Sequence, residues 1–151
     1  MFMQIFPLEE LLHALEVPLI STRIPAGFPS PATDYIETRI DLNRELIKNP
    51  AFTFLAYNEG HSMEPEIPNR SLMLIDRKIT PTEGCIVLAS INREYCVRYF
   101  FKYKDGSIEL RAENPNYKPI HLPDSFEGEF EIFGCVTYSV RKHKHAGRRA
   151  N

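Results

Sequence analysis

The sequence predicts a mostly β protein, in which a compact antiparallel β domain follows an extended N-terminal arm and is accompanied by short helices. Segments rich in Phe, Tyr, Ile and Val recur after residue 50, as is typical of strands. Turn-forming residues separate these segments, and few stretches show helical spacing. The chain has 151 residues, enough for one domain with a core but short for two.

The N-terminal region predicts one short helix and then an open arm. Residues 7–16 have helical spacing, with Pro7 suited to a first helical position and acidic residues in the first turn. Prolines at alternate positions in residues 24–31 then block both a helix and a central strand. We therefore expect an accessible arm over residues 1–40.

A β domain is expected over residues 41–140. Asp41 fits the cap of a short helix over residues 42–48, which must end before Pro50. In the last expected strand, alternate residues are apolar and predict one shared face: Phe130, Ile132, Gly134, Val136, Tyr138 and Val140. The expected strands cover residues 51–57, 72–77, 84–91, 94–103, 108–112 and 128–140.

Charge is distributed unevenly along the chain. The net charge of −2 by itself favours neither a nucleic acid nor an anionic membrane as partner. Without the five positive residues of the tail over residues 141–151, the net charge becomes −7, so the body is acidic. We expect this tail to be solvated, and contact with DNA or with an acidic partner surface is the alternative. The positive residues are Arg141, Lys142, Lys144, Arg148 and Arg149.

Other sequence patterns indicate the cellular compartment and whether a cofactor is expected. Cys85, Cys96 and Cys135 are widely spaced and each lies in an apolar run, which predicts core thiols in a reducing compartment. The N-terminus has the pattern of neither a signal peptide nor a membrane anchor, so we expect a cytoplasmic protein with no membrane partner. His143 and His145 lack accompanying ligands, so no metal and no cofactor are expected.

Two motifs point to a family. Residues 26–32 read Ala-Gly-Phe-Pro-Ser-Pro-Ala, and residues 60–65 read Gly-His-Ser-Met-Glu-Pro. Together they resemble the UmuD branch of the LexA-like Ser/Lys self-cleaving proteins, of the peptidase S24 type. The resemblance runs from about residue 18 to about residue 140 and implies the β fold shared by LexA and bacterial signal peptidases.

The resemblance implies a site for self-cleavage. Family members cut their own arm at an Ala-Gly or Cys-Gly bond, and the matching bond here joins Ala26 and Gly27. Ser62 matches the nucleophile, and the backbone N–H near Met63 would stabilise the oxyanion. In isolation, the proline-rich segment would read as a plain stiff linker.

The chain departs from the family at the general base. The family has a lysine about three dozen residues after the serine, and Arg98 stands there, 36 residues after Ser62. A guanidinium stays protonated near neutrality and cannot accept the serine proton. Loss of a general base slows a reaction by about 100- to 10,000-fold. Replacement by Lys102, Lys104 or His61 is the less favoured alternative.

A second departure lies after the serine, where Arg70 and Ser71 replace a Gly-Asp pair usual in relatives. Losing that glycine is expected to alter the local turn. The resemblance implies a serine peptidase, a hydrolase, but we expect this chain to be inactive or very slow.

The function implied is that of an SOS mutagenesis protein, the accessory subunit of an error-prone translesion DNA polymerase that self-cleaves on RecA stimulation. The implied partners are a second copy in a homodimer, a UmuC-like Y-family DNA polymerase, and the RecA filament on single-stranded DNA. The alternative is a non-catalytic pseudo-protease that binds and regulates an active relative.

Overall fold

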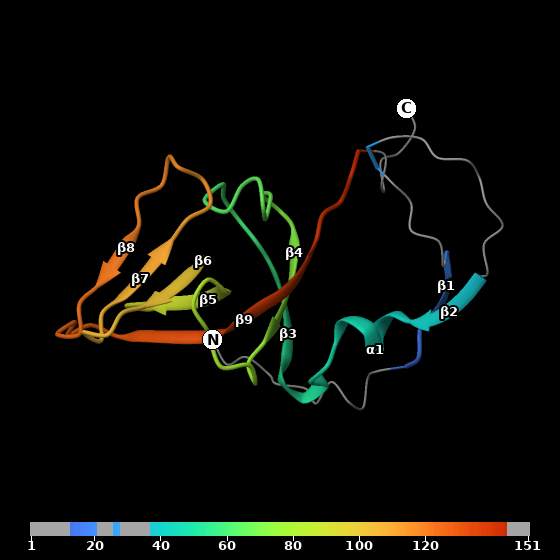
Figure 1. Cartoon of the computed structure of the whole chain (residues 1–151), viewed down its shortest axis with the longest axis horizontal. Coiled ribbons are helices and arrows are strands. Elements are labelled where there is room, and N and C mark those ends of the chain that lie inside the picture. The colour runs from blue at the N-terminus through green and yellow to red at the C-terminus, as the bar shows by residue number, and fades with distance from the viewer. Residues whose placement is uncertain (1–12, 21–25, 28–36, 145–151) are drawn as a thin grey trace. The chain divides into compact units, whose positions relative to one another are not determined.

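The computed structural model describes residues 13–20, 26–27 and 37–144 (Figure 1). The described residues fall into two units, one within residues 1–51 and the other within residues 52–151. No described helix is long and apolar enough to cross a membrane.

The first unit contains a strand pair and a short helix. Strand β1 (Glu16–Ile20) pairs antiparallel with β2 (Glu37–Asp41), and α1 (Leu42–Leu46) follows at once. Oδ1 of Asp41 accepts hydrogen bonds from the backbone N–H groups of Asn43 and Arg44, which confirms the predicted cap. The helix is shorter than predicted because Ile47 has an extended backbone, with φ of −114°.

The arm differs from its prediction in the part that can be compared. Residues 13–15 have no regular structure and Glu16 begins β1, so the predicted helix over residues 7–16 is wrong at its C-terminal end. Pairing with β2 supplies hydrogen bonds that outweigh the weak helical preference of a short segment. Residues 1–12 lie outside the described residues, as does the proline-rich segment apart from Ala26 and Gly27.

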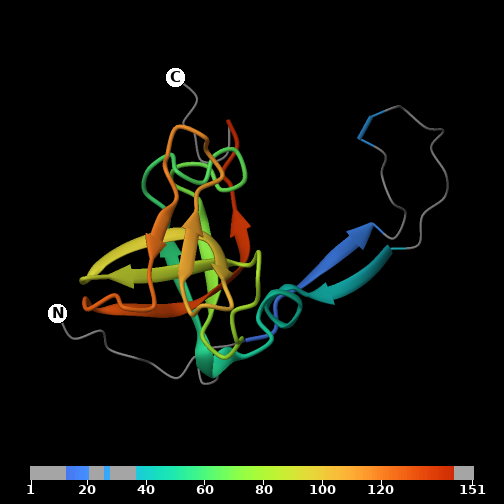
Figure 2. The ribbon, with the colours of Figure 1, turned by 60° about the vertical axis from the view of Figure 1, so that its left-hand side comes forward.

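The second unit is a seven-stranded antiparallel sheet, which confirms the mostly β fold class. Its order is β3-β4-β9-β5-β6-β7-β8 (Figure 2). All six strands expected after residue 50 are present with slightly shorter bounds, and β8 was missed because it has only three residues between two prolines. A 3-10 turn, η2 (Pro50–Phe52), precedes β3. The strands are β3 (Thr53–Tyr57), β4 (Leu72–Asp76), β5 (Ile86–Ile91), β6 (Glu94–Lys102), β7 (Ile108–Arg111), β8 (Ile120–Leu122) and β9 (Phe130–Val140).

Strand β9 does not present the single apolar face that its alternating sequence predicts. It curves between β4 and β5, and its register shifts twice, passing over Thr137 against β4 and over Phe133 against β5 (Figure 1). Each extra residue is a β-bulge, which reverses the alternation beyond it. Ile132 therefore packs with one core cluster and Val136 with the other.

Two apolar clusters lie on opposite faces of β6, because Val97 belongs to one and Phe100 to the other. The first cluster contains Met63, Ile67, Met73, Ile75 and Val97. The second contains Val87, Ala89, Phe100, Leu110 and Cys135. The core role predicted for the cysteines is confirmed, since Cys85 and Cys96 are partly buried against this second cluster.

Replacing Gly134 by alanine is predicted to destabilise the sheet. An added Cβ would lie 2.8 Å from Cγ2 of Ile75 and 3.0 Å from the carbonyl oxygen of Asp76, so β4 would have to move. Overpacking of this kind costs about 1–3 kcal/mol in the free energy of unfolding. Urea denaturation measures the loss. Gly27→Ala is the control, because a Cβ there meets nothing within 4 Å. Equal stability of both variants would contradict the prediction.

Candidate active site

Ser62 lies in the loop that joins β3 to β4, over residues 58–71, and two apolar side chains anchor this loop. Met63 and Ile67 are 0% and 1% exposed and belong to the first core cluster. The N–H of Ile67 donates to the carbonyl of Met63 at 2.8 Å, which closes a turn just after the serine. Ser62 itself is only partly buried, so its hydroxyl remains at the rim of the core.

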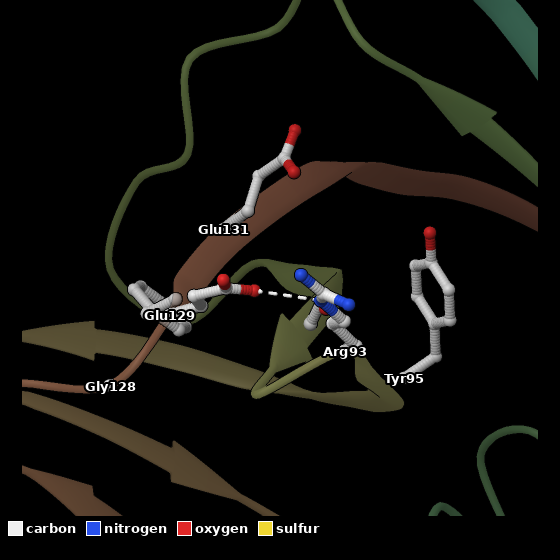
Figure 3. Close-up of a pocket in the computed structure, with 7 residues that line it drawn as sticks. Arg93, Tyr95, Gly128, Glu129 and Glu131 are labelled. Atoms are coloured by element: carbon white, nitrogen blue, oxygen red, sulfur yellow. Dashed lines mark hydrogen bonds and ion pairs between the residues drawn. The ribbon is translucent and has the colours of Figure 1, made fainter.

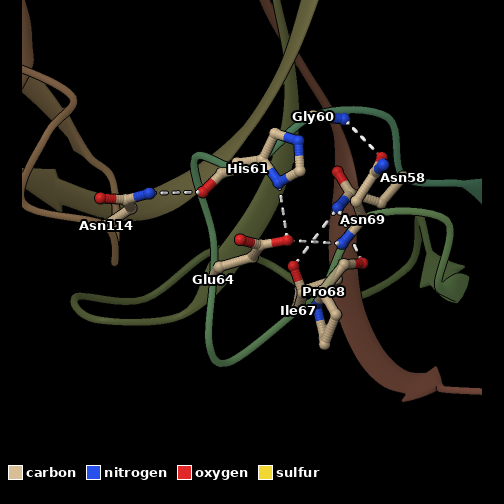
Figure 4. Close-up of polar contacts among 8 residues, drawn as sticks. All are labelled: Asn58, Gly60, His61, Glu64, Ile67, Pro68, Asn69 and Asn114. Atoms are coloured by element: carbon tan, nitrogen blue, oxygen red, sulfur yellow. Dashed lines mark hydrogen bonds and ion pairs between the residues drawn. The ribbon is translucent and has the colours of Figure 1, made fainter. Parts of the chain in front are cut away.

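Asparagine side chains form hydrogen bonds with the backbone of this loop, which contains no helix or strand (Figure 4). Asn58, 5% exposed, donates from its side chain to the carbonyls of Ile67 and Pro68. Asn69 accepts from the N–H of Gly60 at 2.8 Å. A buried loop needs such bonds because unpaired backbone groups are costly. The chain on either side of Ser62 is therefore held in one conformation.

His61 and Glu64 flank the serine and are hydrogen-bonded to each other, with Nδ1 of His61 2.8 Å from Oε1 of Glu64 (Figure 4). The same oxygen accepts from the N–H of Asn69. These hydrogen bonds, that of His61 first, lower the pKa of Glu64 below its ordinary value of 4.5. The imidazole is thus engaged with Glu64.

A second loop, between β7 and β8, fixes the backbone at the serine. The side chain of Asn114 donates to the carbonyl of His61 at 2.9 Å, and its N–H donates to the carbonyl of Ser62 at 3.0 Å. Asn114 also accepts from the N–H of Asn116 and so forms the turn expected there. The hydrogen bond from Asn114 to His61 joins residues 53 positions apart, and no local sequence pattern predicts it.

Arg98 reaches Ser62 from the middle of β6. Its Nη1 donates to Oγ of Ser62 at 2.7 Å and to the carbonyl of Val97 at 2.8 Å. Its Nε is buried with no hydrogen-bond partner. The guanidinium carbon lies 5.9 Å from the centre of the Tyr117 ring. Two residues that are 36 positions apart in the sequence are therefore in direct contact, with the arginine as donor.

This contact gives the serine a donor and no base. A serine hydroxyl attacks a carbonyl only if a neighbouring group accepts its proton. The guanidinium has no lone pair to offer. Tyr99, the next residue on β6, is no substitute, because burial and a hydrogen bond with Glu113 raise its pKa to about 12.

The lysines considered as replacements lie farther along the chain. Lys102 is the last residue of β6, four residues beyond Arg98, which is about 13 Å at the usual strand rise. Both Lys102 and Lys104 are exposed. Among the described residues, Arg98 is the one whose side chain bonds to Oγ of Ser62.

The expected site residues divide between the two units. Ser62, Met63 and Arg98 come together in the second unit, whereas Ala26 and Gly27 lie exposed in a bend of the first. Within the described ranges, no three His, Cys, Asp or Glu side chains are grouped so as to hold a metal.

An open hollow of about 640 Å³ lies elsewhere on the sheet, lined by the β5–β6 hairpin and the start of β9. Arg93 and Glu129 both line it and form an ion pair at 3.2 Å, with Tyr95 and Glu131 beside them (Figure 3). Both charged groups are mostly exposed, so the pair is a solvated surface contact. Ser62 does not line this hollow.

Comparison with known proteins gives a consistent match. The model of the Peptidase S24-like family matches residues 18–137. Protein ImpA of Salmonella typhimurium is 36% identical over 126 residues, which cover 83% of both chains. Protein SamA of Salmonella typhimurium strain LT2 is 39% identical over 83% of this chain and 85% of its own. Protein MucA of Escherichia coli is 31% identical over 84% of this chain and 86% of its own.

Arg70→Gly is predicted to stabilise the loop. Arg70 has φ of +69°, a left-handed conformation that costs a side-chain-bearing residue about 1 kcal/mol and a glycine little. The variant should gain about 0.5–1 kcal/mol in the free energy of unfolding, measured in urea. Arg70→Ala removes the same charge but keeps the Cβ, and should gain nothing. An equal gain in both variants would refute the backbone explanation.

Glu64 is predicted to make stability fall in acid. Because its pKa is lowered in the folded protein, its contribution is present above pH 4.5 and is lost as the pH falls through the folded value. Glu64→Gln should therefore flatten the decline of the urea midpoint below pH 4.5. Glu59→Gln, which removes an exposed carboxylate from the same loop, should leave the decline close to that of wild type. An unchanged decline in Glu64→Gln would contradict the prediction.

Proposed function

Because the chain belongs to the peptidase S24-like family, we propose that it is a UmuD-type SOS mutagenesis protein whose self-cleavage site is silent. The match extends over residues 18–137, which include the Ala26–Gly27 bond, Ser62 and Arg98. The relatives ImpA, SamA and MucA are UmuD homologues and match most of their own length. The observation that carries the proposal is the 2.7 Å hydrogen bond from Arg98 to Ser62.

The proposed silence follows from the steps that cleavage requires. Oγ of Ser62 would attack the carbonyl carbon of Ala26, and its proton would have to pass to a base. The leaving amine of Gly27 would then need a proton from the same group. Arg98 can donate but cannot first accept, so neither transfer begins. The backbone N–H of Met63 would remain in place as an oxyanion donor, serving a reaction that lacks its base.

In this proposal the uncut protein acts through its partners. We propose a homodimer that binds a UmuC-like Y-family polymerase and meets the RecA filament on single-stranded DNA, as the family implies. An apolar patch on β3, β4 and β9 suits a dimer, because three paired strands carry it on one face. Its exposed residues are Leu55 and Tyr57 on β3 and Tyr138 and Val140 on β9, with the partly buried Leu72 of β4 between them.

The same contact favours a second candidate, a pseudo-protease that pairs with an active relative and limits its action. A mixed dimer would contain one serine without a base. Mixing this chain with a self-cleaving relative distinguishes the candidates, since a regulator must slow cleavage or polymerase activation in that relative and an independent subunit leaves both unchanged.

Arg98→Lys is predicted to restore cleavage between Ala26 and Gly27. A lysine partly buried in this position can lose its proton and serve as base, so the rate should rise by at least about 100-fold. The proteins are incubated with RecA, single-stranded DNA and a nucleotide, or alone at alkaline pH. Intact mass then reports loss of residues 1–26.

Two controls test whether restored cleavage depends on Ser62 and on a lysine at position 98 in particular. The double variant Ser62→Ala/Arg98→Lys should stay whole, and Arg93→Lys, which makes the same exchange on an exposed ion-paired arginine, should behave as wild type. Cleavage of the wild type at Ala26–Gly27 that depends on Ser62 would refute the silent site. A folded Arg98→Lys that remains whole would refute the assignment of Arg98 to the base position.

A further inference from the structure

Arg98 differs from four other described arginines in the charge that surrounds it. Four arginines, on β2, on β7 and in the turns after β4 and β5, lie within 4 Å of a glutamate, whereas no described carboxylate pairs with Arg98. Arg98 is also partly buried, where an unpaired charge is more costly than at the surface. The four ion pairs are Arg39–Glu16, Arg77–Glu131, Arg93–Glu129 and Arg111–Glu109.

The hydrogen-bond donors that remain free at this position belong to Ser62 and Arg98. Oγ of Ser62 already accepts from Nη1 of Arg98, so its own proton is available to a third group. Nη2 of Arg98 has no partner among the described residues and, unlike Nε, is not among the enclosed atoms. A hydroxyl and a guanidinium together match a ligand that only accepts and that carries negative charge.

We propose that Ser62 and Arg98 form a binding site for the carboxylate of a peptide. The guanidinium neutralises the carboxylate, and the Ser62 hydroxyl donates to one of its oxygens. A singly charged carboxylate fits better than a phosphate, because one arginine supplies one positive charge and the body of the chain is acidic. This inference rests on the proposed silence of the site, since an active serine would need the same hydroxyl for attack.

The carboxylate can come from a chain terminus or from an acidic side chain, and three peptides distinguish these sources. The first contains residues 22–26 and ends in the free carboxylate of Ala26. The second is the same peptide with a C-terminal amide. The third is the amide with the substitution Ala26→Asp. Each is titrated into the full-length chain while the backbone amide signals of Ser62 and Met63 and the side-chain amide of Asn114 are followed by NMR.

A carboxylate-bearing peptide is expected to shift these signals and to saturate, and the neutral amide should bind at least about tenfold more weakly. Saturation by the first peptide alone identifies a terminal carboxylate, and saturation by the third alone identifies an acidic side chain. Inorganic phosphate, tested in the same way, should bind more weakly than either. Equal binding of the amide, or tighter binding of phosphate, would overturn the proposal.

Matched variants locate the effect. Arg98→Gln should weaken binding of the preferred peptide by at least about tenfold, and Ser62→Ala by a smaller factor. Arg93→Gln removes the same charge from the surface and should change affinity less than about twofold. Equal losses in Arg98→Gln and Arg93→Gln would show a general charge effect and refute the site.

Intact mass after each titration separates this inference from the proposed function. Cleavage of the wild type would refute the silent site, whereas an uncut chain that fails to bind any carboxylate would refute only the carboxylate site. Arg98→Gln is checked for a dispersed spectrum. If it does not fold, Ser62→Ala and the difference between acid and amide peptides in the wild type decide the outcome.

Discussion

The hydrogen bond from Arg98 to Ser62 is the interaction on which the chemistry of this chain depends. It brings a permanent cation within 2.7 Å of the hydroxyl that we propose as the counterpart of the family's nucleophile. The distance is that of a strong charge-assisted hydrogen bond. In this bond Ser62 accepts from Arg98, whereas catalysis would require Ser62 to give its own proton to a base. A deprotonated lysine at this position would be able to accept the serine proton, whereas an arginine can only donate.

The rest of the fold positions this pair. The sheet carries an apolar cluster on each face, and Met63 and Ile67 fasten the serine loop to one of them. Asparagine side chains then satisfy the backbone that the loop leaves unpaired. These contacts hold the serine in place without help from a base, which agrees with the proposal that the site keeps its geometry but lacks activity.

Sequence reasoning succeeded where one local pattern decides the outcome. Strand composition identified six strands of the large sheet, and Asp41 identified its helix. It failed where distant residues decide: the β1–β2 pairing overrode a weak helical pattern, and bulges at Phe133 and Thr137 broke an alternation that looked regular. The link from Asn114 to the serine loop spans 53 residues and has no local signature.

The reactivity of the Ser62 hydroxyl measures its activation most directly. A fluorophosphonate reagent bonds to serines whose proton a neighbouring base can take, and mass spectrometry of the digested chain locates the label. Ser62 in the wild type should remain unlabelled from neutral to alkaline pH, as any surface serine does. Rapid, stoichiometric labelling at Ser62 would show that some group in the chain accepts its proton, and would contradict the silencing role of Arg98.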